Sequence, residues 1–237
     1  MNIQQQYDKY FSAGFVEFNQ SDKSRKVMSN MYEHNYAKFL PRDKESSVLD
    51  FGCGAGQGLS WLKDRGYKNY LGVDISKEAV EFCKAKKLLV EKIDGPIVWL
   101  KKNKEKYNVI ISNDVIEHIP KEDIIPTMSA LYGALKKGGV MIVKTNNVSA
   151  LTGARMRYWD HTHSTSFTEF SMMQVLKYAG VEEFNFYPFT FPLNKPTRII
   201  RRLFQSILHA IWKFIYWLEY TLVPKIVHEY FFAVIKK

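Results

Sequence analysis

The stretch VLDFGCGAGQG, residues 48–58, decides the fold of this chain. An apolar run ends on the acid Asp50, glycines then alternate with small residues, and a helical pattern follows. This order is typical of a buried strand, a tight turn and the N-terminus of a helix. Glycine lets the backbone approach a ligand closely because it has no Cβ. At the carboxyl edge of a parallel sheet, such a turn is where doubly wound folds bind nucleotides.

A second acid, Asp74, ends the run YLGV at residues 70–73, about the distance downstream at which an acid binds a ribose. The dinucleotide fingerprint G-x-G-x-x-G requires a third glycine where this chain has Gln57. Alternating glycines after a strand-terminal acid instead resemble the first motif of class I S-adenosylmethionine-dependent methyltransferases. The resemblance implies S-adenosylmethionine as the cofactor, whereas the plainer interpretation is a tight turn without a ligand.

The resemblance also implies which residues hold the cofactor. The glycine turn would border its methionine part, Asp74 its ribose and Asp94 its adenine, while the segment that starts at Asn113 would pass beneath the methyl group. We expect the helices in the first forty residues to pack on the domain. The resemblance implies the alternative that they cover the cofactor, with Tyr10 among the contacts. The expected cofactor contacts are Asp50, Gly52, Cys53, Gly54, Gly56, Asp74, Ile75, Asp94, Asn113 and Tyr10.

Strand-like apolar runs alternate with helical patterns along the chain, which predicts right-handed crossovers and a mostly parallel sheet. The resemblance adds a closing antiparallel hairpin formed by the last two strands. We therefore expect an α/β fold with a doubly wound, seven-stranded, mostly parallel, Rossmann-like sheet. The chain should be a single methyltransferase domain. Its parts are an N-terminal helical cap (1–45), a cofactor-binding core (46–187), an amphipathic helical insertion (188–226) and the last strand (227–237).

The formal charge of +10 is concentrated near the C-terminus, because eight cations and two acids follow Pro188. Such a basic region indicates an anionic partner: a membrane surface, a nucleic acid or a phosphorylated substrate. The chain has only two cysteines, Cys53 and Cys83, which argues against a fold held by disulfide bonds and fits a reduced, cytoplasmic setting. Neither a signal peptide nor an apolar stretch long enough to span a bilayer is visible.

The segment RYWDHTHSTSFT, residues 157–168, gathers charged and imidazole side chains after the predicted fifth strand. Its pattern Arg-Tyr-x-Asp-x-Thr-His-x-x-x-Phe-Thr resembles a subgroup of methyltransferases associated with bacterial surface-polysaccharide biosynthesis. The matched positions are Arg157, Asp160, His163, Phe167 and Thr168. This resemblance implies a saccharide or a glycan precursor as the acceptor.

A hydroxyl is a poor nucleophile, so a base with a near-neutral pKa is useful when it attacks the methyl carbon. We expect His163 to be this base, with His118 as the second candidate and Asp160 as the carboxylate that orients the imidazole. A metal site formed by Asp160, His161 and His163 is the alternative, but these ligands are too local, and no metal is expected. In the plainest interpretation, the histidines only hold the loop together.

The insertion carries an apolar stripe over residues 199–215 with cations on its opposite face. This pattern predicts a helix that lies on anionic lipid at the inner face of the membrane, with Arg198, Arg201, Arg202 and Lys213 toward the lipid. Trp212, Tyr216 and Trp217 would suit the bilayer interface. Packing on the chain's own domain or on a second copy of the chain is the alternative.

These observations together predict an S-adenosylmethionine-dependent O-methyltransferase that acts on a saccharide or glycan precursor. O-methylation of a lipid or quinone precursor at the membrane is the alternative, and a non-catalytic cofactor-binding scaffold is the second alternative. Nucleic acid is not an expected partner, because the cations lie on an apolar-backed helix and are not interleaved with exposed aromatic residues. The Asn/Asp-Pro-Pro-aromatic signature of enzymes that methylate exocyclic base nitrogens is also lacking.

Overall fold

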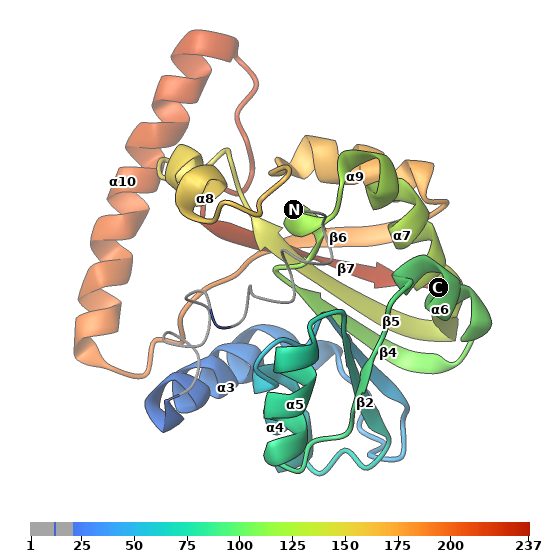
Figure 1. Ribbon diagram of the computed structural model, residues 1–237. Coiled ribbons are helices and arrows are strands. Elements are labelled where there is room, and N and C mark those ends of the chain that lie inside the picture. Colours follow the sequence, from blue (N-terminus) through green and yellow to red (C-terminus); the bar gives the residue numbers. More distant parts are fainter. Residues whose placement is uncertain (1–11, 13–20) are drawn as a thin grey trace.

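A computed structural model describes residue 12 and residues 21–237 (Figure 1). Residues 1–11 and 13–20 of the predicted cap therefore lie outside the described residues, and so does the predicted contact between Tyr10 and the cofactor. The described part of the cap contains helix α3 (Asp22–Tyr36) and the short helix η2 (Ala37–Phe39). Helix α3 begins at Ser21, whose side chain accepts a hydrogen bond from the Ser24 backbone N–H.

The described chain forms a seven-stranded sheet in the order β3-β2-β1-β4-β5-β7-β6. Strands β1 to β5 are parallel, and β7 runs antiparallel to both β5 and β6. This arrangement confirms the predicted fold, including the closing hairpin. The strands are β1 (Val48–Phe51), β2 (Tyr70–Asp74), β3 (Val90–Lys92), β4 (Tyr107–Asn113), β5 (Leu135–Asn146), β6 (Glu183–Pro188) and β7 (Tyr230–Lys236).

Two hydrophobic cores lie on the two faces of the sheet. In β4, Ile110 belongs to one core, while Val109 and Ile111 belong to the other, as the alternation of side chains along a strand requires. The first core includes side chains of α6 (Pro96–Lys102), α7 (Lys121–Ala134) and α9 (Glu169–Tyr178). The second includes side chains of α3, α4 (Gln57–Asp64) and α5 (Lys77–Ala85). The layers are visible on either side of the sheet in Figure 1.

Helix and strand boundaries follow the local signals in most places. Ser76 caps α5 and Thr168 caps α9, each accepting a hydrogen bond from a backbone N–H three residues later. Residues 136–139, which include two consecutive glycines, belong to β5 itself. The pairing of β4 with β5 shifts register between Tyr107 and Val109, and this irregularity accommodates Gly138 at a φ of 74°.

The insertion forms one long helix, α10 (Pro196–Tyr220), which stands at the edge of the molecule beside the short helix α8 (Gly153–Trp159) (Figure 1). Within the described chain, none of the 25 residues of α10 is buried. Its polar side faces the body of the domain: Arg202 contacts His228 at 3.3 Å, and the Trp212 indole N–H donates to the Ser149 carbonyl at 2.9 Å. The bulky aliphatic side chains point away from the body and are exposed.

This orientation differs from the predicted one, in which the cations of α10 face the lipid. Arg198, Arg202 and Lys213 lie partly buried against the body rather than on an outer surface. The Lys213 ammonium, for example, donates to the Lys225 carbonyl at 2.7 Å. Tyr216 also bonds to the Ser149 carbonyl, at 3.3 Å, so of the three predicted interface aromatics only Trp217 is exposed. The outer face of α10 is therefore apolar.

Candidate functional site

The glycine turn after β1 has the conformation that its sequence predicts. Gly52, Gly54 and Gly56 have φ values of 73°, 48° and 72°, which residues with a Cβ rarely adopt. A Cβ on Gly52 would also lie 2.4 Å from the Val115 side chain. The Asp74 carboxylate holds the turn, because it accepts hydrogen bonds from the backbone N–H groups of Gly54 at 2.9 Å and Ser76 at 2.8 Å.

A cavity of about 1560 Å³ follows the carboxyl ends of the parallel strands. Single drug-sized ligands occupy pockets of roughly 300–1,000 Å³, so this cavity has room for two molecules. Gly56 does not line the cavity; it precedes α4 as its N-terminal cap. Eight of the predicted cofactor contacts do line it: Asp50, Gly52, Cys53, Gly54, Asp74, Ile75, Asp94 and Asn113.

Carboxylates give this end of the cavity an acidic character in a chain that is basic overall. Burial, and then the nearby Asp74 carboxylate, raise the pKa of Asp50 to about 7. Burial also raises the pKa of Asp74, although hydrogen bonds from Ser76 and Gly54 oppose the shift. S-adenosylmethionine carries a sulfonium and an ammonium group, which would favour the ionised form of both acids. The glycine turn and these acids therefore fit the cofactor.

The raised pKa of Asp50 predicts how the stability of the cofactor-free protein depends on pH. Between the unfolded pKa of about 3.8 and the folded pKa of about 7, only the folded chain keeps the Asp50 proton, so stability falls as pH rises through this window. From pH 5 to pH 8 this loss is about 3 kcal/mol. Urea unfolding at both pH values should show that Asp50→Asn loses less stability than the wild type by this amount. Equal losses would contradict the assignment.

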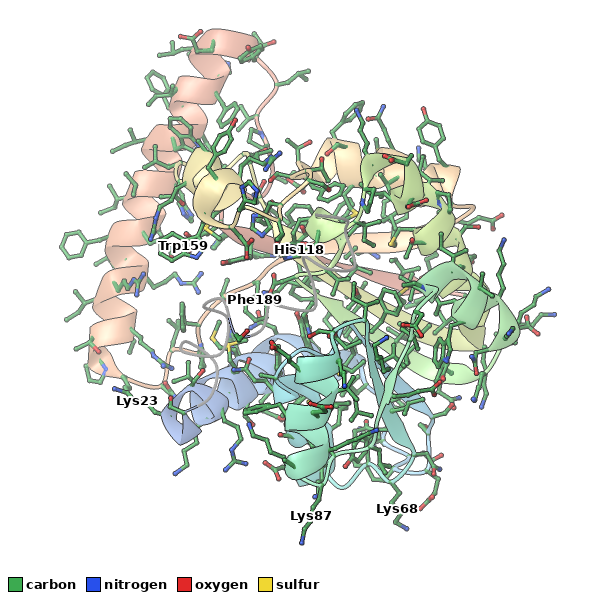
Figure 2. All side chains as sticks on the ribbon, viewed as in Figure 1. Lys23, Lys68, Lys87, His118, Trp159 and Phe189 are labelled. Atoms are coloured by element: carbon green, nitrogen blue, oxygen red, sulfur yellow. The ribbon has the colours of Figure 1, made fainter. Side chains whose placement is uncertain are left out.

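The second end of the cavity contains the two predicted histidines. His118 ends the short helix η3 (Ile116–His118), which follows β4, while His163 lies on the loop between α8 and α9. The ring centroids are 4.7 Å apart, and both side chains line the cavity. Figure 2 shows His118 near the centre of the molecule, in line with the carboxyl edge of the sheet. The structure thus brings together the two candidate bases, which are 45 positions apart in the sequence.

The carboxylate predicted to orient His163 bonds instead toward His118. The Asp160 carboxylate accepts a hydrogen bond from the Thr162 hydroxyl at 2.7 Å, and this hydroxyl lies 2.7 Å from Nδ1 of His118. His163 bonds elsewhere, because its Nδ1 lies 2.9 Å from the Met156 carbonyl oxygen. These contacts connect Asp160 to His118 through Thr162, and the orientation of His163 by Asp160 stays a prediction. His161 is exposed.

The other matched residues of the 157–168 segment build the loop that carries His163. The Arg157 guanidinium donates to the backbone carbonyls of His163 and Ser164. The backbone N–H of Ser164 donates to the Glu117 carbonyl at 2.8 Å, which fastens the loop to η3. Phe167 is buried in the core and Thr168 caps α9. These contacts fix the position of His163 relative to His118.

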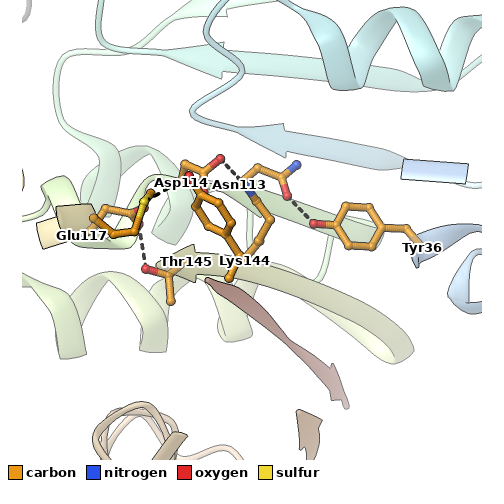
Figure 3. A network of polar contacts seen from close by, with 8 residues as sticks. Tyr36, Asn113, Asp114, Glu117, Lys144 and Thr145 are labelled. Carbon is orange, nitrogen blue, oxygen red and sulfur yellow. Dashed lines mark hydrogen bonds and ion pairs between the residues drawn. The ribbon is translucent and has the colours of Figure 1, made fainter. Parts of the chain in front are cut away.

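A polar network that the sequence did not reveal joins residues at the carboxyl ends of β4 and β5 (Figure 3). The Thr145 hydroxyl donates to the Glu117 carboxylate at 3.0 Å, and Lys144 forms an ion pair with Asp114. Burial, followed by the Asp114 charge, raises the pKa of Glu117 to about 8. Burial, followed by His163, lowers the pKa of His118 to about 4. In the sequence, Glu117 could have been found as the acid directly before His118, in the segment that follows the fourth strand.

This end of the cavity has aromatic walls and a basic side. Trp159 of α8 and Phe189, which follows β6, both line the cavity and lie near His118 in the view of Figure 2. Phe191 and Leu193 also line it and are partly exposed. Three guanidinium groups of α10 complete the wall: Arg198, Arg201 and Arg202.

One buried polar group in the wall has no partner in the described structure. The Asn146 side chain ends β5, is fully buried, and neither its amide nitrogen nor its oxygen forms a hydrogen bond to the described residues. Buried polar groups are normally paired, so an unpaired amide in a cavity wall indicates a place where a ligand binds. The second end of the cavity is therefore a candidate acceptor site.

Residues 24–182 match the family model described as "Methyltransferase domain". This match covers more than half of the chain, and the fold and the glycine turn agree with it. The chain belongs to this methyltransferase family. The match includes the glycine turn, Asp74 and both histidines, and it ends before the insertion that contains α10. The family uses S-adenosylmethionine, for which the acidic end of the cavity is suited.

Two curated proteins are similar to parts of the methyltransferase. One, "Ubiquinone biosynthesis O-methyltransferase" of Pelagibacter ubique, is 35% identical over 121 residues, which are 47% of this chain and 49% of that protein. The other, a "Probable S-adenosylmethionine-dependent methyltransferase" of Mycolicibacterium smegmatis, is 25% identical over 64% of this chain and 58% of that protein. The chain thus spans about half of the length of the curated relatives it matches. The polysaccharide-associated subgroup has no counterpart among these relatives.

Solved structures share the fold. A methyltransferase from Archaeoglobus fulgidus aligns with a TM-score of 0.68 at 21% identity, covering 96% of this chain and 100% of that one. The plantazolicin methyltransferase BamL, crystallised with S-adenosylhomocysteine (SAH), aligns with a TM-score of 0.60 at 18% identity over 99% and 95% of the two chains. In the part of the methyltransferase that the structure describes, no helix combines the length and apolarity needed to cross a membrane.

Proposed function

We propose that this methyltransferase transfers a methyl group to a hydroxyl oxygen of a lipid-soluble acceptor of the lipid or quinone-precursor class. The observation that carries the proposal is the acceptor end of the cavity. Its aromatic walls continue into exposed apolar residues, Phe191 and Leu193, and these lie at the start of α10, whose outer face is apolar. An acceptor with a long apolar tail would bury its hydroxyl near the histidines and leave its tail on this surface.

The relative from Pelagibacter ubique supports the same class of acceptor. Its printed name assigns it O-methylation in ubiquinone biosynthesis, and its similarity to this chain extends over 121 residues. This similarity favours the quinone-precursor alternative over the saccharide acceptor that the 157–168 segment predicted. The contacts of Arg157, Phe167 and Thr168 explain much of that segment as loop structure, so its pattern does not require a saccharide.

The residues at the acceptor end can position a hydroxyl and remove its proton. S-adenosylmethionine supplies an electrophilic methyl group when it is bound. His163 donates its Nδ1 proton to the Met156 carbonyl, so its Nε2 carries the lone pair that can accept a proton. Burial lowers the pKa of His118 to about 4, which makes His118 a weak base near neutral pH. The Asn146 amide can hold the acceptor by a hydrogen bond.

A phosphorylated saccharide precursor is the second candidate acceptor. It is favoured by the three arginines of α10 in the cavity wall, because guanidinium groups bind phosphate bidentately. Phe191, which lies beside Arg198 and Arg201, also offers an aromatic surface to the apolar face of a sugar ring. The two classes therefore differ in which residues of the same cavity they would use.

A panel of three acceptors tests the proposal: a catechol with a long isoprenoid tail, the same catechol without the tail, and a nucleotide-linked sugar. Methyl transfer is measured with radiolabelled S-adenosylmethionine in detergent. We expect kcat/KM for the tailed catechol to exceed that for the tail-free one at least tenfold, because burial of an apolar tail contributes about 0.8 kcal/mol per CH₂. Preferential methylation of the sugar would establish the second candidate. Cofactor binding without transfer to any acceptor would instead support the scaffold alternative.

We also propose an anionic lipid surface as the partner of α10. The outer face of this helix exposes bulky apolar side chains over its whole length, and for example Phe204 is 66% exposed. Three cations in or next to α10 are also exposed, namely Lys195, Arg201 and Lys225. An amphipathic helix of this kind binds at the boundary between lipid head groups and acyl chains. A lipid-soluble acceptor could then enter the cavity directly from the bilayer.

A further inference from the structure

Three side chains of metal-ligand type meet at the acceptor end of the cavity: the Glu117 carboxylate and the imidazoles of His118 and His163. Their ligand atoms all lie within 4.8 Å of one another. Nitrogen and oxygen ligands bind a zinc-type ion at roughly 2.0–2.2 Å, so ligand atoms around one ion lie at most about 4.4 Å apart. Small side-chain rotations therefore suffice to close the three groups around one ion.

The hydrogen bonds of both imidazoles place the ring proton on Nδ1, which leaves the lone pair on Nε2. The Thr162 hydroxyl has one proton and donates it to the Asp160 carboxylate, so it accepts the Nδ1 proton of His118. The Met156 carbonyl can only accept, and it receives the Nδ1 proton of His163. Both rings therefore carry a lone pair on Nε2. A histidine that donates one ring N–H to a carbonyl, or through a hydroxyl to a carboxylate, has the support that metal-ligating histidines need.

The third group and its surroundings also suit a cation. Glu117 is 1% exposed, and its carboxylate accepts a hydrogen bond from the Thr145 hydroxyl, which fixes its orientation. Asp114 and Asp160 line the same part of the cavity. The nearby ammonium group of Lys144 forms an ion pair with Asp114. A divalent ion would therefore bind among three carboxylates and one lysine.

We propose that Glu117, His118 and His163 bind one divalent transition-metal ion of the zinc class, with an open coordination position toward the acceptor. Three protein ligands with a further position open to a cavity are the usual arrangement of a catalytic metal site. A hydroxyl that binds at the open position loses its proton more easily, because the ion stabilises the oxyanion. The inference rests on the proposed function for the hydroxyl acceptor, and the ion would then replace His163 in activating it.

Metal binding is measured without any acceptor, so its outcome is independent of the acceptor panel. The full-length protein is freed of metal with a chelator and titrated with Zn²⁺ by calorimetry, and then with Co²⁺ while the visible absorption spectrum is recorded. We expect one high-affinity ion per chain and a Co²⁺ spectrum of nitrogen and oxygen coordination. His118→Ala and His163→Ala should each weaken binding at least about a hundredfold, since loss of a supporting residue alone costs 10- to 100-fold.

Two matched variants control for ions held by other imidazoles. His161→Ala removes an exposed histidine from the same loop, and His209→Ala removes one member of a second ring pair, in which His209 and His228 lie 4.6 Å apart. Both should retain the ion. A wild type that binds no ion, or an ion that survives His118→Ala and His163→Ala but is lost with His209→Ala, would overturn the proposal. Circular dichroism confirms that each variant is folded, and Glu117→Gln provides a further ligand variant.

Discussion

His163→Ala is expected to lower the turnover of the methyltransferase about a hundredfold or more while S-adenosylmethionine binds with nearly unchanged affinity. The substitution removes the Nε2 lone pair at the acceptor end, and positioned general bases contribute roughly 10²- to 10⁴-fold. The effect is expected in either role of the residue, as the base of the metal-free protein or as a ligand of an ion. His163 lies on the loop between α8 and α9, whereas the glycine turn follows β1 and Asp74 ends β2, so we expect the affinity for the cofactor to be unchanged.

The measurement combines initial rates on the best acceptor of the panel with calorimetry of cofactor binding. His209→Ala is the matched control, since it removes an imidazole of α10 that is not among the residues lining the cavity and should leave the rate within about threefold of the wild type. His118→Ala is the internal comparison. If only the His118 change abolishes turnover, the base has been assigned to the wrong histidine. If neither change matters, positioning alone provides the catalysis.

Local chemistry made the cofactor end of the site predictable from the sequence. The backbone conformation of the turn requires glycine at Gly52, and the acid Asp74 ends a strand that pairs in parallel with β1. Strand ends that are adjacent in a parallel sheet bring their residues to one edge, so the order of elements already fixes which residues meet. This reasoning fails for contacts that depend on how a loop folds back. The link from Asp160 through Thr162 to His118 is such a contact.

Glu117 and α10 show two further limits of the sequence. A single acid beside a histidine gives no periodic signal, and only the tertiary structure places Glu117 within reach of His163. For α10, the apolar and polar stripes were visible, but periodicity does not say which stripe faces the protein. The usual expectation is that the apolar stripe is buried. Here Trp212, Tyr216 and Arg202 bind the body by their polar atoms, and the apolar stripe is left outside.

Phe204→Glu combined with Ile207→Glu is expected to abolish the binding of the methyltransferase to anionic liposomes. Both side chains lie on the outer face of α10, where they are 66% and 53% exposed. Burying one such side chain in an apolar phase contributes about 1.5–3 kcal/mol. Losing two therefore weakens binding more than roughly a hundredfold, and the added carboxylates are repelled by anionic lipid. Cosedimentation with vesicles of phosphatidylglycerol and phosphatidylcholine measures the loss.

Leu89→Glu combined with Val98→Glu is the matched control, because these residues are exposed to a similar extent, 52% and 58%, and lie away from α10. It introduces the same charge change and should leave liposome binding unchanged. High salt should weaken the wild-type interaction without abolishing it, since salt screens the exposed cations but not the apolar contact. Sedimentation velocity tests the remaining interpretation, that the chain self-associates through α10. A wild type that ignores liposomes but sediments as a dimer, and becomes monomeric in the Phe204 and Ile207 variant, would assign the outer face of α10 to a second copy of the chain.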